Sequence, residues 1–146
     1  MKGKFAALAV VIAVLMPACA HRMNENNALY GKWSCLSAVV DGRSLPEETT
    51  KLLRLTITEH GYKTEKGREV LFESTYTTDT SKNPKQINMV GTEGDLAGKE
   101  AQGIFAVEGD RLEICYTMPG LMRPTKLESP PGSKAYWIVW KREPLH

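Results

Sequence analysis

The sequence predicts an all-β protein, an antiparallel up-and-down barrel of about eight strands with one short helix after the first strand. Two observations lead to this prediction. Short segments rich in β-branched and aromatic residues recur along the chain, and turns or loops rich in Gly, Pro, Asn and Asp separate them. In addition, no pair of these segments has the spacing of a βαβ unit, in which a long helical crossover joins parallel strands.

Length and composition exclude several classes of protein. The 146 residues suit one domain, and 42% hydrophobic with 25% charged residues is an ordinary globular composition rather than a disordered, collagen-like or multi-span membrane one. The 19 Lys and Arg residues include Lys2 and Lys4, and the remaining 17 equal the 17 Asp and Glu residues in number. Because that balance gives no electrostatic case for nucleic-acid binding, we expect no nucleic-acid partner.

The N-terminus has the pattern of an export signal. Two lysines precede an apolar run over residues 5–16, which is too short for a comfortable bilayer span, and Pro17 follows it. We expect a signal peptide over residues 1–18 and a polar, flexible tether over residues 19–28. The domain would then lie outside the cytoplasm, as a membrane-anchored lipoprotein of the cell envelope or as a periplasmic or secreted protein.

Two cleavage sites compete at the end of this segment. Cleavage before Cys19 would leave a thiol that takes a lipid, and cleavage after Ala20 would fit the small-x-small rule. An uncleaved anchor is a third alternative. The position of Cys19 at the boundary of the apolar run favours the lipid, which would attach the protein to a membrane.

The first strand and the helix are expected from local signals. Residues 30–40 are rich in β-forming side chains and end at the turn Asp41-Gly42. Ser44 is a candidate helix cap, Pro46 suits an early helical position, and Glu47 completes a capping box. The helix must be brief, because a period-two pattern follows it closely.

The remaining strands follow from the same kind of pattern. We expect them over residues 53–58, 62–66, 70–78, 86–90, 103–107, 111–117 and 134–142. Clusters of Gly, Pro, Ser and Asn mark longer loops over residues 79–84, 91–99 and 118–133. No second-domain linker is visible, so residues 29–143 are expected to form the barrel domain.

Barrel closure is expected at the two ends of this domain. Gly31 and Trp33 begin the first strand, and Arg142 lies in the last one. First and last strands pair in an up-and-down barrel, so Arg142 would cover Trp33 with a stacking energy of about 0.5–2 kcal/mol. Gly31 would let the backbone pass closely under the ring. This Gly-x-Trp opening resembles the lipocalin signature.

A longer resemblance covers about residues 29–143. Its elements are Leu29-Tyr30-Gly31-Lys32-Trp33, Leu53-Arg54-Leu55-Thr56-Ile57, Lys82-Asn83-Pro84-Lys85-Gln86, Gly103-Ile104-Phe105, Leu112-Glu113-Ile114-Cys115-Tyr116 and Arg123-Pro124. In their order and spacing they resemble a family of small exported lipocalin-like domains that is abundant in planctomycete bacteria. The resemblance implies a lipocalin-like β-barrel and transfers no catalytic residue, because the family has no assigned activity.

Two cysteines remain once Cys19 is set apart, and export would permit a disulfide between them. Cys35 has the same strand parity as the inward Trp33, whereas Cys115 alternates with Leu112 and Ile114 and so faces the other way. A disulfide and two free thiols both remain open.

No catalytic or metal-binding set is visible. His60 is the one histidine within the barrel domain, and it lies in a turn. A nucleophile–base pair would have to be built on it, and Cys35, Cys115 and His60 lack the spacing of a metal site. We therefore expect no catalytic residue, no metal and no cofactor.

The expected function is the binding of a small apolar or amphipathic ligand inside the barrel. Tyr116, Tyr136 and Trp140 are the candidate ligand-binding aromatics, and Arg123 is the candidate polar group at the mouth. The alternative is a protein-binding or inhibitor module of the cell envelope that acts through its loops, with a filled barrel. An enzyme that uses a carboxylate or a tyrosine inside the barrel is the third hypothesis.

Overall fold

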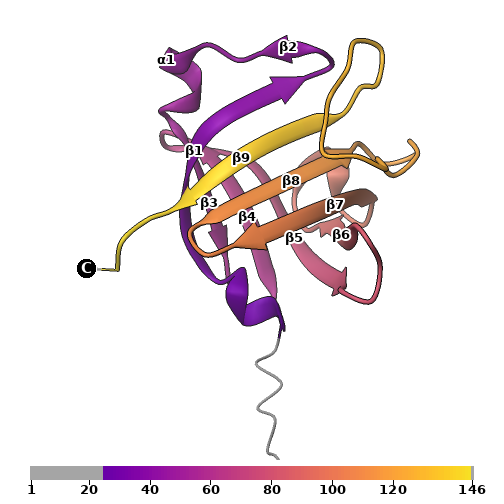
Figure 1. The fold of residues 1–146 in the computed structure, drawn as a ribbon, viewed down its shortest axis with the longest axis horizontal. Helices are drawn as coiled ribbons and strands as arrows, with labels where there is room; N and C mark the ends of the chain where they lie inside the picture. Colours follow the sequence, from indigo (N-terminus) through magenta and orange to yellow (C-terminus); the bar gives the residue numbers. More distant parts are fainter. Residues whose placement is uncertain (1–24, 146) are drawn as a thin grey trace, which may run out of the picture.

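Eight antiparallel strands close into a barrel in the computed structural model, which describes residues 25–145 (Figure 1). The strands are β1 (Gly31–Val40), β3 (Leu53–Ile57), β4 (Gly61–Lys66), β5 (Glu69–Asp79), β6 (Lys85–Gly91), β7 (Glu100–Glu108), β8 (Arg111–Thr117) and β9 (Tyr136–Arg142). Each pairs with the next in this order, and β9 pairs with β1. The predicted all-β, up-and-down barrel is therefore confirmed.

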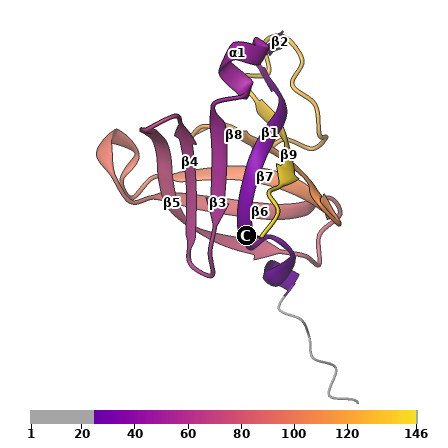
Figure 2. The same cartoon turned by 90° about the vertical axis from the view of Figure 1, so that its left-hand side faces the viewer.

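Four short elements lie outside the barrel wall. They are η1 (Glu25–Ala28), β2 (Arg43–Ser44), α1 (Glu47–Thr50) and η2 (Gly94–Leu96). Figure 2 shows α1 and β2 at one end of the barrel and η1 at the opposite end. The barrel therefore has two differently covered ends.

The expected signal peptide and the lipidation candidate Cys19 lie outside the described residues. Residues 25–28, expected to be part of a flexible tether, form η1. Among residues 25–145, no helix is long and apolar enough to cross a bilayer.

The helix after the first strand is present, but the expected start is wrong. Pro46 is the N-cap of α1, in an extended conformation, and no side chain caps the helix by a hydrogen bond. Ser44 is not available as a cap, because its backbone pairs with Val39 in the β1–β2 hairpin. The amides of Thr49 and Thr50 donate to the Pro46 carbonyl instead.

Strand ends differ most from expectation in β7 and β9. Strand β7 begins three residues early, because Glu100 and Ala101 pair with the end of β6. Strand β9 begins at Tyr136, two residues late. Lys134 has a φ of 55° and its amide donates to an Asp41 carboxylate oxygen, so the chain is still turning there.

Most of the core lies inside the barrel, but a second cluster lies outside it. Alternate residues of every strand point inward and form the main core, which includes Trp33, Met89 and Trp140. Ile104, Cys115 and the outward residues near them form a smaller core under the loop of residues 118–135. The loop therefore covers part of the outer wall.

Candidate functional site

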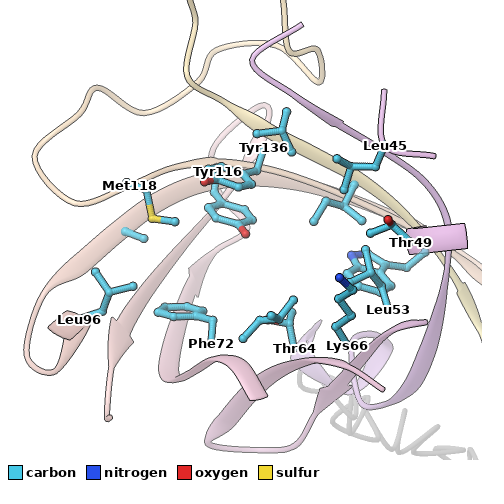
Figure 3. Close-up of a pocket in the computed structure, with 15 residues that line it drawn as sticks. Leu45, Thr49, Leu53, Thr64, Lys66, Phe72, Leu96, Tyr116, Met118 and Tyr136 are labelled. Carbon is cyan, nitrogen blue, oxygen red and sulfur yellow. The ribbon is translucent and has the colours of Figure 1, made fainter. Parts of the chain in front are cut away.

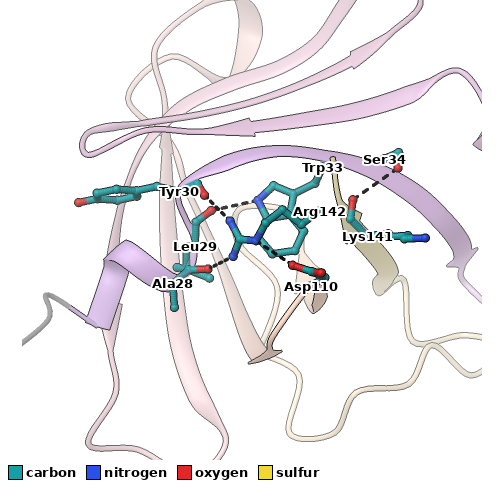
Figure 4. A network of polar contacts seen from close by, with 8 residues as sticks. All are labelled: Ala28, Leu29, Tyr30, Trp33, Ser34, Asp110, Lys141 and Arg142. Atoms are coloured by element: carbon teal, nitrogen blue, oxygen red, sulfur yellow. Dashed lines mark hydrogen bonds and ion pairs between the residues drawn. The ribbon is translucent and has the colours of Figure 1, made fainter. Parts of the chain in front are cut away.

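The end of the barrel beside η1 is closed by a stacked pair of side chains. Trp33 begins β1 and is fully buried, and Arg142 ends β9 directly opposite it in the strand register. The guanidinium carbon of Arg142 lies 4.2 Å from the centroid of the Trp33 ring, as Figure 4 illustrates. A cation over an indole face at this distance is a favourable interaction.

Arg142 also joins the chain that precedes β1 to the barrel. Its two terminal nitrogens donate to the carbonyl oxygens of Tyr30 and Ala28, at 2.5 and 2.6 Å, and its Nε lies 3.5 Å from a carboxylate oxygen of Asp110. The Trp33 indole donates to the Leu29 carbonyl at 3.0 Å (Figure 4). Both side chains thus donate hydrogen bonds to the segment that covers this end of the barrel.

The backbone at position 31, which forms part of this closure, requires a glycine. Its φ is +132°, and a Cβ atom there would lie 3.2 Å from a terminal nitrogen of Arg142. A larger residue at this position would strain the backbone and crowd the guanidinium.

The opposite end of the barrel contains a cavity of about 220 Å³. It lies among the ends of the strands that approach α1 and η2, and Figure 3 looks into it. Its lining residues are Val40, Leu45, Thr49, Leu53, Thr64, Lys66, Leu71, Phe72, Leu96, Ala101, Tyr116, Met118, Tyr136, Ile138 and Trp140. The lining is therefore mostly apolar, with Thr49, Thr64 and Lys66 as polar members, and no carboxylate belongs to it.

Three of the four predicted ligand-binding residues line this cavity. Tyr116 and Tyr136 stack with ring centroids 5.0 Å apart and an interplanar angle of 6°. Trp140, in the same strand as Tyr136, has an exposed fraction of 1%. Burial raises the pKa of the Tyr116 hydroxyl well above its ordinary value, and the neighbouring Tyr136 raises it further, so this hydroxyl stays neutral over the physiological range.

The chain thus forms a closed eight-stranded meander with one covered end and one hollow end. The fold is a lipocalin-like barrel. No protein-family model, no curated protein and no solved structure matches the chain.

Arg123, the fourth predicted residue, is not at the mouth, so that prediction needs correction. Its guanidinium donates to the carbonyl oxygens of Ile87 and Gly103 at 3.1 and 2.7 Å, and to the side-chain oxygen of Asn88 at 2.5 Å. Asn88 alternates with the buried Ile87 and Met89, so it faces outward. Arg123 therefore holds the loop of residues 118–135 against the outer wall.

The two cysteines are free thiols on opposite faces of the wall. Cys35 packs against the core inside the barrel, whereas Cys115 belongs to the outer cluster, where its Sγ donates to the Glu128 carbonyl at 3.3 Å. Side chains that point to opposite faces of a sheet cannot be bridged without moving the backbone. The structure thus contains two thiols rather than a disulfide.

Sequence reasoning missed three polar members of the lining, Thr49, Thr64 and the charged Lys66. A period-two signal could have found Thr64 and Lys66, because these two and Tyr62 alternate with outward residues in β4, and Tyr62 and Thr64 are buried. Leu96 was also missed, because it comes from η2 in a segment expected to be only a loop. Within residues 25–145, no group of three or more His, Cys, Asp or Glu side chains is placed to hold a metal ion.

Proposed function

We propose that this protein is an exported, lipid-anchored barrel that binds a small apolar or amphipathic molecule in its open end. The observation that carries the proposal is the apolar cavity of about 220 Å³. Burial against apolar and aromatic side chains is the main source of affinity in such sites. Export, attachment through Cys19 and membership of the planctomycete family are parts of the same proposal, and they rest on the sequence pattern.

The size of the cavity limits the ligand. An engineered apolar cavity of about 150 Å³ accepts benzene, so a cavity of this size suits a buried part of about nine non-hydrogen atoms. Ligands of that size bind with a Kd on the order of 0.1 mM when each atom contributes an intermediate efficiency. We therefore expect weak, saturable binding of a small molecule.

The proposal is tested by a substitution that places a larger side chain in the cavity. Ala101 lines the cavity on β7 with an exposed fraction of 2%, whereas Ala106 lies on the same strand with its side chain exposed. Ala101→Leu should abolish the quenching or enhancement of tryptophan fluorescence by 1-octanol, and Ala106→Leu should leave it unchanged. Urea unfolding of both variants checks that they fold. Equal binding by the wild type and Ala101→Leu would place the ligand elsewhere.

The attachment is tested separately by the mass of the protein purified from its own envelope. Under denaturing conditions, a lipid on Cys19 adds its mass to a chain that begins at that residue. A chain that begins at His21 with no added mass would instead show the alternative cleavage.

A loop-mediated interaction with an envelope protein is the second candidate. The observation that favours it is the loop of residues 118–135, in which Met122 is 89% exposed and Leu121 is 39% exposed. The wild type and Met122→Ser would be compared for binding to the same envelope extract. This candidate was expected together with a filled barrel, and the cavity argues against that part of it.

A further inference from the structure

The one charged side chain of the cavity lining lies at one side of the cavity. Figure 3 shows Lys66 there with Thr49, Leu45 and Leu53, and it shows Leu96, Met118 and Phe72 at the other side. Lys66 ends β4, in register with Leu53 on β3, so it shares the inward parity of Tyr62 and Thr64, but as the last residue of the strand it is exposed to solvent. A molecule that fills this hollow therefore meets a cation at one end and hydrocarbon at the other.

Lys66 has no counterion in the described part of the chain. No ion pair and no side-chain hydrogen bond involves its Nζ within residues 25–145, and the cavity lining holds no carboxylate. By contrast, Lys63 lies three strand positions away on the outward side and pairs with Glu65 at 3.1 Å. The inward lysine is thus available to an anion from outside the protein.

Trp140 supplies an independent sign of a missing acceptor. Its Nε1 is buried and has no hydrogen-bond partner, although its residue lines the cavity. An indole N–H can only donate, and leaving a buried donor unpaired costs about 1–3 kcal/mol. Two other buried polar atoms lack partners among the described residues, Tyr62 Oη and Trp137 Nε1, but neither residue lines this cavity.

The strand register brings the two donors to the same level of the barrel. Trp140 on β9 lies opposite Cys35 on β1. Ser34 lies opposite Arg54, so Cys35 is level with the neighbouring Leu53, and Leu53 is paired with Lys66. Both side chains belong to the cavity lining, and the strands β1 and β3 lie between the two strands that carry them.

We infer that the ligand is a small amphipathic carboxylate. The carboxylate accepts hydrogen bonds from the Lys66 ammonium and the Trp140 indole, and the apolar body lies against Phe72, Leu96 and Met118. Charge-assisted hydrogen bonds are stronger than neutral ones, and the solvent-exposed Lys66 offers one at the mouth of the cavity. The inference rests on the proposed function, since it assigns a ligand class to the same cavity.

Octanoate and 1-octanol are the probes, because they share an alkyl chain and differ in the charged group. Each is titrated into the full exported chain at pH 7.5, and the heat of binding is measured by calorimetry to obtain the affinity. We expect octanoate to bind about tenfold more tightly than 1-octanol, which corresponds to one charge-assisted hydrogen bond. Lys66→Met should remove that preference while changing the affinity for 1-octanol less than about twofold, since the alkyl stem is kept.

Lys63→Met is the matched control, because it removes a lysine from the same strand but from the outer face. It should leave both affinities unchanged. Hydrogen bonding by the Trp140 indole is followed without mutation, from the chemical shift of its N–H resonance in the wild-type protein labelled with nitrogen-15. Octanoate should shift this resonance downfield, and 1-octanol should shift it less.

The possible outcomes separate the two proposals. Equal affinities for octanoate and 1-octanol, with no effect of Lys66→Met, would overturn the carboxylate inference and leave the apolar cavity as the binding site. An equal loss of octanoate affinity in Lys63→Met would show that surface charge alone is responsible, and it would also overturn the inference. Binding of neither probe would overturn the proposed function itself.

Discussion

Arg142 lies over Trp33 with its guanidinium carbon 4.2 Å from the ring centroid, and the two residues are directly paired across β1 and β9. This one contact therefore connects the first and last strands of the barrel and covers one end of the core. It also orients the two terminal nitrogens of the Arg142 guanidinium toward the chain before β1. Tyr30 and Ala28 supply the two carbonyl acceptors. Because the ends of the chain meet here, this contact should influence the stability of the whole barrel.

Replacing Arg142 should destabilise the fold more than replacing a comparable surface arginine. Arg142→Met removes the stack and the two carbonyl contacts, and we expect the free energy of unfolding in urea to fall by about 2–3 kcal/mol. Arg111→Met is the control, since Arg111 is an exposed β8 residue whose one ion pair spans 3.5 Å. It should cost about 0.5 kcal/mol or less. Equal losses in the two variants would contradict the role given to Arg142.

Replacing Arg123 should affect stability without affecting the cavity. Arg123→Met removes three hydrogen bonds that attach the loop of residues 118–135 to β6 and β7, and about 1–3 kcal/mol of stability should be lost. The affinity for 1-octanol should stay the same, because Arg123 does not line the cavity. Lys126→Met, an exposed position in the same loop, serves as the control for both measurements. A selective loss of ligand binding in Arg123→Met would contradict this assignment and would instead support a role for Arg123 at the mouth of the cavity.

The two thiols, of which Cys35 is half-buried and Cys115 is buried, should make the protein less stable in alkali. Burial raises the pKa of both Cys35 and Cys115 from about 9 to about 11. From about pH 9 to pH 11 the unfolded chain releases thiol protons that the folded chain keeps, so the free energy of unfolding falls as the pH rises. Below pH 8 these two groups contribute no slope.

A double variant isolates this effect from the tyrosines, which also titrate in alkali. Urea unfolding of the wild type and of Cys35→Ala/Cys115→Ala at pH 8, 9 and 10 should give a shallower pH dependence for the double variant. The difference should be at most about 1.4 kcal/mol per pH unit and thiol. The slopes are compared rather than the absolute stabilities, because removing the buried Cys115 side chain itself leaves a small void. Identical slopes would show that the thiols ionise equally in both states.

Local patterns predicted the strands well where side chains alternate and turn residues are explicit. The period-two run that includes Leu53, Leu55 and Ile57 became β3, and the turn between β7 and β8 follows its Gly-Asp signal. The ends of β7 and β9 were displaced for non-local reasons: Glu100 pairs with Val90, and Lys134 donates its amide to Asp41. Such contacts join residues far apart in sequence, so no local window contains them.

The candidate site was predicted in the same uneven way. Tyr116, Tyr136 and Trp140 could be named because bulky aromatics in short strands must be buried somewhere. Arg123 could not be placed, because the surface that it contacts is formed by β6 and β7 together. Pairing of these two strands cannot be seen in the local sequence around Arg123. Lys66 was visible as an alternating position but had no distinguishing feature until the surrounding lining proved apolar.

The sequence by itself determined the all-β class, the order and number of the barrel strands, and the aromatic character of the interior, because these follow from periodicity and turn chemistry along the chain. Only the tertiary structure decided that the end opposite the Trp33–Arg142 closure is hollow, and which surface Arg123 contacts. Those properties depend on how side chains from several strands share one volume. That packing is set when the barrel closes between β1 and β9.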